Sequence, residues 1–167
     1  VGSNAASHHL TTWNNIMTYS DSINRSGSLC INTDIGRASS RMCSIHVTGY
    51  AYGAAEIIDF TISFYTYSGA NGQDDVAGYP FSPTIVDRGT DGHNKYVGIN
   101  ADGNIAIAID EPDSGNKYYY GFKCTLDNHL NSTGHSAYNS WSSSYSEVNQ
   151  NGWLDYRIPV PTLVQDN

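Results

Sequence analysis

The sequence predicts an all-β fold, an antiparallel β-sandwich of jelly-roll-like type. Two observations lead to this prediction. Apolar and polar residues alternate over many short runs, and successive side chains of a strand point to opposite faces, so each run makes one apolar and one polar face. Clusters of Gly, Asn, Asp, Ser and Pro separate these runs at frequent intervals, and no long amphipathic helix pattern competes with them. Seven or eight short strands of this kind are typical of sandwiches and jelly rolls.

The composition suits one domain with a neutral polar surface. The chain has 167 residues, of which 14% are charged and 12% are aromatic, so it is long enough to bury a core and too rich in aromatic residues to be disordered. The formal charge of −8 and the scattered basic residues disfavour nucleic acid and anionic membrane surfaces as partners. No apolar run approaches the roughly 20 residues that span a bilayer, so membrane insertion is not expected.

The clearest element is a hairpin over residues 41–68, with a turn at residues 53–56. Its two strands each present an apolar face, made by Cys43, Ile45 and Val47 and by Ile58, Phe60, Ile62 and Phe64. The opposite faces are polar. His46 lies on the polar face of the first strand, where we expect it to make a cross-strand or subunit contact.

The segments before this hairpin are less regular. Residues 1–27 predict an irregular connecting segment with a short helical turn, because Leu10, Trp13, Ile16 and Met17 have spacings of three, three and one. They carry none of the basic and apolar regions of a signal peptide, and we expect the chain to be part of a longer protein. A first strand follows at residues 28–33, and a turn is expected through residues 34–36 and 39–40.

The segments after the hairpin alternate strands and turns. A Gly-rich loop at residues 69–80 precedes a strand at 81–86, which Pro83 assigns to a sheet edge. Residues 95–100 and 104–110 predict a second hairpin with Asp102-Gly103 as its two-residue turn. A long strand is expected at 117–126, a polar segment at 127–152 and a last short strand at 153–160.

Metal and cofactor binding are not expected. Cys30, Cys43 and Cys124 lie in expected strands without Cys-x-x-Cys spacing, so we interpret them as buried thiols. The trio Asn100, Asp102 and Asn104 resembles a metal-binding loop, but the hairpin explains these residues better.

The assembled features resemble the distal domain of bacteriophage tail fibres. The resemblance covers residues 28–161 and rests on the order of the motifs. A Met-x-x-Ile-x-Val-x-Gly-Tyr-x-Tyr-Gly strand at residues 42–53 precedes an Ile-Asp-x-x-Ile-x-Phe-Tyr-x-Tyr strand at 58–67. A Pro-x-Ile strand, a Tyr-rich strand at 119–122, an aromatic-Ser segment at 138–141 and a final strand at 156–160 follow.

This resemblance implies a homotrimeric fibre tip on the virion that adheres to a receptor on the bacterial surface, often a polysaccharide. Residues 1–27 would then connect to the fibre shaft, residues 28–161 would form the receptor-binding sandwich, and residues 162–167 would be a C-terminal tail. Such fibres are frequently followed by a self-cleaving chaperone domain, which would suit a processed C-terminus.

The residues favour binding over catalysis. A glycosidase needs two carboxylates at a set separation, and Glu56, Glu111 and Glu147 all lie in expected turns or loops; the Gly-x-Ser-x-Gly elbow of serine hydrolases is missing. We therefore do not expect an enzyme, although a tailspike-like hydrolase and a purely structural knob remain alternatives.

Shallow sugar sites combine aromatic rings with amide and hydroxyl groups. The loops and the C-terminal stretch offer that mixture. The candidate receptor-binding residues are Tyr79, His135, Tyr138, Asn139, Trp141, Tyr145 and Trp153. A structural role is the competing interpretation for the two tryptophans, Trp141 and Trp153.

Overall fold

The described part of the chain is built from two antiparallel β-sheets. The computed structural model describes residues 9–21, 28–36, 41–51, 55–66, 81–100, 102–110, 120–130, 140–146 and 158–159. The strands are β1 (His9–Ser20), β2 (Ser28–Gly36), β3 (Arg41–Ala51), β4 (Glu56–Thr66), β5 (Phe81–Asp87), β6 (Asn94–Ile99), β7 (Asn104–Asp110), β8 (Tyr120–Leu130), β9 (Ser142–Ser146) and β10 (Ile158–Pro159). The all-β, antiparallel class predicted from the sequence is confirmed.

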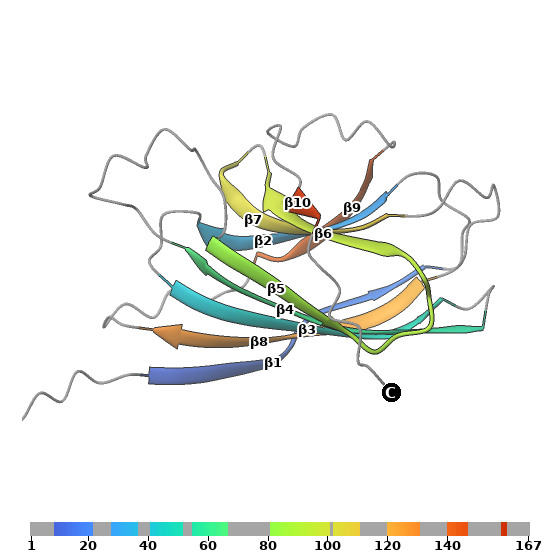
Figure 1. The fold of residues 1–167 in the computed structure, drawn as a ribbon, viewed down its shortest axis with the longest axis horizontal. Coiled ribbons are helices and arrows are strands. Elements are labelled where there is room, and N and C mark those ends of the chain that lie inside the picture. The colour runs from blue at the N-terminus through green and yellow to red at the C-terminus, as the bar shows by residue number, and fades with distance from the viewer. Residues whose placement is uncertain are drawn as a thin grey trace, which may run out of the picture.

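The two sheets lie in two layers around one apolar core (Figure 1). The first sheet has the order β1-β8-β3-β4-β5, and the second has the order β10-β6-β7-β2-β9. Fully buried side chains of both sheets belong to the same cluster, among them Ile45, Phe60, Ile62 and Leu126 from the first and Leu29, Ile31, Ile107 and Ile109 from the second. Burying such a side chain contributes about 1.5–3 kcal/mol, so the contact between the layers dominates the stability.

The predicted hairpin at residues 41–68 is confirmed as β3 and β4. Its register runs without interruption from Arg41 opposite Thr66 to Ala51 opposite Glu56. In the middle of both strands the inward residues are buried and the outward residues are half-buried, as the two-residue period requires. Ala55, in the connecting turn, has a φ of 55°.

Strand β8 lies between β1 and β3 and is longer than expected. The residues of β8 from Tyr120 to Leu130 pair with β3, and those between Gly121 and Leu130 pair with β1. The expected end of this strand at Leu126 is wrong, since β8 continues into the polar segment as far as Leu130. The apolar alternation ends at Leu126, but Asn128 is still fully buried and its Oδ1 accepts a hydrogen bond from the Cys43 thiol at 3.6 Å. A buried amide with a partner can occupy an inward position that the pattern reserves for apolar residues.

The expected helical turn near the N-terminus is wrong, because residues 9–20 form the edge strand β1. Between Trp13 and Met17 the chain advances four residues while its partner β8 advances from Leu126 only to Cys124. This bulge includes Asn15, with a φ of 52°, and it brings Trp13, Ile16 and Met17 all against the core. The bulge therefore imitates a helical spacing, and bulges also protect sheet edges from pairing with other chains. The expected connecting segment of residues 1–27 thus contains a strand of the sheet.

The first part of the expected turn, residues 34–36, is also wrong, since β2 continues to Gly36. Residues 39–40 lie outside the described residues. The register shifts between Asn32 and Gly36, where the Thr33 hydroxyl donates to the carbonyl of Ile105 at 2.6 Å and accepts from the Ile35 N–H at 3.1 Å. This side chain replaces regular strand pairing, so turn-forming residues are kept within a strand and Ile35 is fully buried.

The hairpin of β6 and β7 is confirmed, but its turn is longer than two residues. Asn100 pairs with Asn104, and the N–H of Gly103, with a φ of 77°, donates to the carbonyl of Asn100 at 3.0 Å. The Asn100 Oδ1 accepts the N–H groups of Asp102 at 3.1 Å and Asn104 at 3.0 Å. The trio that resembles a metal loop is thus explained by the hairpin, as expected.

The edges of the sheets match the sequence in part. β5, which contains Pro83, is an edge strand as predicted. The Ser-rich strand β9 was not predicted; it pairs with β2, and Asn32 Nδ2 donates to Ser144 Oγ at 3.1 Å. Of the last expected strand, the structure describes β10, which pairs with β6. No helix in the described ranges has the length and apolar character to cross a membrane.

The three cysteines are free and buried, as predicted. Burial raises the pKa of Cys43 to about 12, although the charge of Arg41 acts in the opposite direction, and burial also raises the pKa of Cys124 to about 12. These thiols remain protonated near neutral pH and behave as small apolar side chains.

Gly49 provides a test of how closely β3 and β8 approach. A Cβ at Gly49 would overlap the carbonyl oxygen of Gly121 and lie 2.5 Å from the Cα of Phe122. Backbone atoms in a paired strand cannot move away without breaking the sheet, so we expect Gly49→Ala to lower the free energy of unfolding by at least about 2 kcal/mol. Urea denaturation measures this. Gly36→Ala is the control, because the nearest atom would be 4.0 Å from its Cβ; equal losses in both variants would contradict the close approach.

Candidate functional site

The outer face of the first sheet is polar along its middle. Ser44 and Ser63, opposite each other on β3 and β4, join their hydroxyl oxygens at 2.8 Å. The next outward residue of β3, His46, places its Nε2 2.8 Å from the Oδ1 of Asp59 on β4. This diagonal pair confirms the cross-strand interpretation of His46. The middle of the outer face of the first sheet therefore carries hydroxyl, imidazole and carboxylate groups that are hydrogen-bonded across β3 and β4.

Exposed apolar groups stand at the two ends of this polar band. Among the described residues the large exposed hydrophobic side chains are Met42, Tyr50 and Ile57, with relative exposures of 55%, 49% and 56%. Tyr50 and Ile57 are direct cross-strand partners at one end, and Met42 lies opposite Tyr65 at the other. Exposed aromatic residues beside polar neighbours mark surfaces that bind ligands or partners more often than single exposed aliphatic residues do.

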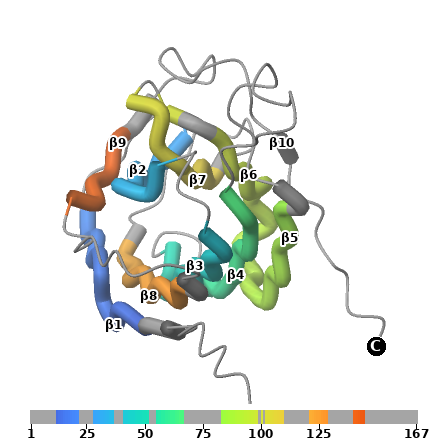
Figure 2. The backbone as a smooth tube through the Cα atoms, turned by 90° about the vertical axis from the view of Figure 1, so that its left-hand side faces the viewer, coloured from blue at the N-terminus to red at the C-terminus, as the bar shows by residue number. Residues whose placement is uncertain are grey.

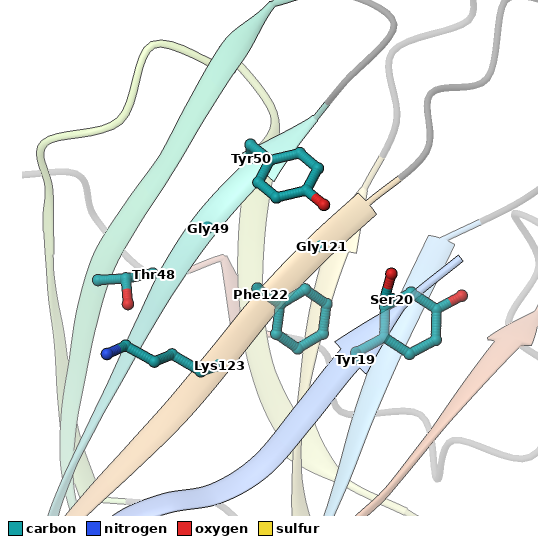
Figure 3. A pocket seen from close by; sticks show the side chains of 8 residues that line it. All are labelled: Tyr19, Ser20, Thr48, Gly49, Tyr50, Gly121, Phe122 and Lys123. Carbon is teal, nitrogen blue, oxygen red and sulfur yellow. The ribbon is translucent and has the colours of Figure 1, made fainter. Parts of the chain in front are cut away.

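A shallow hollow lies at the Tyr50 end, over strands β1, β8 and β3 (Figure 3). Its volume is about 410 Å³. The residues that line it are Tyr19, Ser20, Thr48, Gly49, Tyr50, Gly121, Phe122 and Lys123. Three strands that are distant in the chain meet here, because β8 pairs with both β1 and β3.

Tyr50 is held in place over a glycine. Gly121 is its partner on β8, and a Cβ there would lie 2.5 Å from Cζ and 2.6 Å from the hydroxyl oxygen of Tyr50. The ring thus occupies the space where a side chain of residue 121 would stand. An aromatic ring that covers a cross-strand glycine is a known stabilising pair in sheets, and here half of that ring stays exposed.

The core side and the solvent side of the sheet at the hollow differ in chemistry. Tyr19 and Phe122 are direct partners on β1 and β8, and on the core side their rings stack with centroids 5.2 Å apart and an interplanar angle of 24°. The Tyr19 hydroxyl donates to Asp21 Oδ2 at 3.0 Å, which fixes that ring. The rim carries the exposed side chains of Ser20 and Lys123 and the half-buried Thr48, which is the β3 partner of Lys123.

This arrangement suits recognition of a polar ligand with one flat apolar face. A ring stacked on Tyr50 would have the hydroxyl groups of Ser20 and Thr48 and the ammonium group of Lys123 around it as hydrogen-bonding groups. The hollow is open to water. In the described ranges no group of three or more His, Cys, Asp or Glu side chains could hold a metal ion.

Asp59 is the electrostatic centre of the neighbouring polar band. Its Oδ1 lies 3.2 Å from Arg88 Nη2 as well as 2.8 Å from His46 Nε2. Burial is the largest single influence and raises the pKa of Asp59, but the hydrogen bonds from His46 and Arg88 and their charges together outweigh it. The pKa of Asp59 therefore lies below its ordinary value of 3.8.

The candidate residues chosen from the sequence do not gather at this hollow in the described part of the chain. Trp141 lies beside the second sheet, where its Nε1 donates to Asp34 Oδ1 at 2.8 Å and its ring packs against the core. A structural role for Trp141 is therefore the better interpretation. The backbone of Tyr145 belongs to β9. The other candidates, Tyr79, His135, Tyr138, Asn139 and Trp153, lie outside the described residues.

Sequence reasoning missed the hollow because its residues come from three separate segments. Tyr50 was noted as part of a motif and not as a binding residue. The available signal was a glycine at an outward position of β8, Gly121, in a strand otherwise rich in large residues, since such a glycine indicates close approach of another group.

The comparisons with known proteins do not assign the chain to a family. No family model matches it, and neither a curated protein nor a solved structure is significantly similar to it.

The carboxylate of Asp59 predicts a specific dependence of stability on pH. Because its folded pKa is depressed, its contribution is fully present above the unfolded value near 3.8 and is lost as the pH falls through the folded pKa. We expect Asp59→Asn to lower the free energy of unfolding by less than about 1 kcal/mol at pH 6, since the cluster is solvent-exposed, and by less still at pH 2. Urea denaturation across this range measures the difference. Asp102→Asn, in an exposed loop, is the control; a loss at Asp59 that is independent of pH would contradict the assignment.

Proposed function

We propose that the chain is the receptor-binding tip of a bacteriophage tail fibre, located at the distal end of the fibre on the virion, and that it adheres without catalysis to a bacterial surface glycan such as a polysaccharide or lipopolysaccharide. The observation that carries the proposal is the shallow hollow on the first sheet, with the half-exposed ring of Tyr50 held over Gly121. The resemblance of residues 28–161 to fibre tips supplies the biological setting.

The chemistry of the hollow supports glycan binding. The apolar face of a sugar ring stacks on an aromatic side chain, while hydroxyl and amino groups around it bind the sugar hydroxyls. Tyr50 provides the ring, and Thr48, Ser20 and Lys123 provide the polar groups. An open site of this kind accepts an internal residue of a long polymer, which an enclosed pocket would exclude.

We also propose that the sandwich is jelly-roll-like, which the strand pairing supports. β1 pairs with β8 in the first sheet while β2 pairs with β7 in the second, as in a folded-over antiparallel ribbon. The chain departs from a strict jelly roll after β3, because β3, β4 and β5 continue as a meander in one sheet.

Homotrimeric assembly would compensate for a weak single site. A shallow hollow with one stacking ring offers modest affinity. Three copies on one fibre, and several fibres on one particle, turn later binding steps into intramolecular ones, which raises the avidity without new contacts.

The proposal predicts how variants of the hollow bind to purified host polysaccharide. We expect Tyr50→Ala to weaken binding by roughly 3- to 10-fold, the worth of one aromatic stacking contact, and Tyr50→Phe to bind nearly as the parent does. Met42→Ala, an exposed apolar residue at the other end of the same face, is the matched control and should bind normally. Surface plasmon resonance on immobilised polysaccharide measures all four proteins.

The outcomes separate the site from the function. Absence of binding by the parent chain to any host surface glycan would contradict the adhesin proposal and favour a structural knob. Binding that is unchanged in Tyr50→Ala would move the site away from the hollow, and Tyr79→Ala and Tyr138→Ala would then test the loop residues chosen from the sequence. Shortened polysaccharide chains after incubation would favour the tailspike-like hydrolase.

The proposal also predicts the state of assembly of the chain. Light scattering of the purified chain should give the mass of three copies, and Tyr50→Ala should give the same mass. A monomer would weaken the fibre-tip proposal. A variant that loses the trimer would instead assign the outer face of the first sheet to subunit contact.

A further inference from the structure

A buried lysine lies where the chain crosses from the first sheet to the second. β5 ends at Asp87 in the first sheet, and β6 begins at Asn94 in the second, so residues 88–93 form the crossover (Figure 2). The crossover first follows β4, since the N–H of Arg88 donates to the carbonyl of Asp59 at 2.7 Å and that of Thr90 to the carbonyl of Ile57 at 2.8 Å. Lys95, the second residue of β6, then points into the space between the sheets.

The ammonium group of Lys95 is enclosed by two carboxyl groups and a ring. Its side chain is 2% exposed, and its Nζ lies 2.7 Å from Asp87 Oδ2 and 2.9 and 2.7 Å from Asp91 Oδ1 and Oδ2. The side chain of Asp91 is completely buried and that of Asp87 is 14% exposed. The ring of the fully buried Phe60 lies 5.6 Å from Nζ and covers it from the core.

A purely ionic cluster is an expensive way to close this crossover. Taking each ion out of water costs several kcal/mol, and one cation cannot neutralise two carboxylates. If the ammonium and one carboxylate condensed to a neutral amide and released a water molecule, two buried charges would disappear and most of this penalty with them. The three groups are the reactants for such a condensation, held in a site that excludes bulk water.

We propose that Lys95 and Asp87 form an intramolecular isopeptide bond, with Asp91 as the group that carries the protons. The amide joins Nζ of Lys95 to Cγ of Asp87, and it connects the end of β5 in the first sheet to β6 in the second. This modification is independent of the glycan site on the outer face.

The step balances without any further reagent. Asp91 accepts a proton from the Lys95 ammonium, and the freed lone pair of Nζ attacks Cγ of Asp87. A second proton passes from nitrogen through Asp91, and one carboxyl oxygen of Asp87 leaves as water. One ammonium and one carboxylate become one amide and one water molecule, and Asp91 ends as it began.

The geometry distinguishes the roles of the two aspartates. Asp87 contacts Nζ through one oxygen, while its Oδ1 accepts the N–H of Gly89 at 2.9 Å. That N–H stabilises the negative charge which develops on Oδ1 when Cγ is attacked, as donors in oxyanion holes do. Asp91 faces Nζ with both oxygens, which is the arrangement of a proton acceptor.

Mass spectrometry of the intact purified chain tests the proposal directly. We expect a mass lower by one water molecule than the sequence requires, and a protease digest in which the peptides that contain Asp87 and Lys95 remain joined. The full sequence mass would overturn the proposal, and a crosslink mapped to Asp91 would overturn the assignment of Asp87.

Variants then test the assigned roles. Lys95→Met keeps an unbranched buried side chain and should show the full mass expected for its sequence. Asp91→Asn should stay uncrosslinked although both linked residues are present, and full crosslinking of this variant would overturn the role of Asp91. Lys123→Met, which removes an exposed lysine in the first sheet, is the matched control and should still be lower by one water molecule.

Discussion

The contact between the two apolar sheet faces is the interaction on which the rest of this structure depends. Each sheet has one face of Ile, Leu, Val and Phe side chains, and neither face could stay in water without losing the main source of stability. Facing each other, they form one cluster that includes Ile45, Phe60 and Leu126 from one layer and Ile31 and Ile107 from the other. Because each strand turns only every second side chain toward this core, the strands that form it need alternating apolar and polar residues.

Because the two sheets share one core, the chain must cross between them. The described β5–β6 crossing carries Lys95, Asp87 and Asp91 into the interior, where they pair with one another. Because the inner faces form the core, the proposed ligand binding is left to the loops and the outer faces. In the described residues the outer face of the first sheet carries a shallow hollow beside Tyr50 and its glycine partner.

The sequence predicted strands well where apolar alternation was the whole signal, as in β3, β4 and β7. It failed where a hydrogen bond replaced an apolar contact or where the register slipped. The bulge between Trp13 and Met17 imitated a helix, the Thr33 hydroxyl kept turn-forming residues inside β2, and buried Asn128 extended β8 beyond its apolar pattern. β9 was missed because a strand of serines at a sheet edge carries no apolar period.

What the sequence determined by itself is the all-β class, the apolar faces of the main strands, the edge position of β5 and the burial of the three cysteines. These follow from local rules, since a strand alternates its side chains and proline leaves a ladder unpaired whatever the partner is. The tertiary structure alone decided which strands are neighbours, and so which side chains meet. Tyr50 stands over Gly121, and Lys95 between Asp87 and Asp91, because of strand register and sheet crossing. Such long-range pairings depend on the packing of the whole core, and no local pattern encodes them.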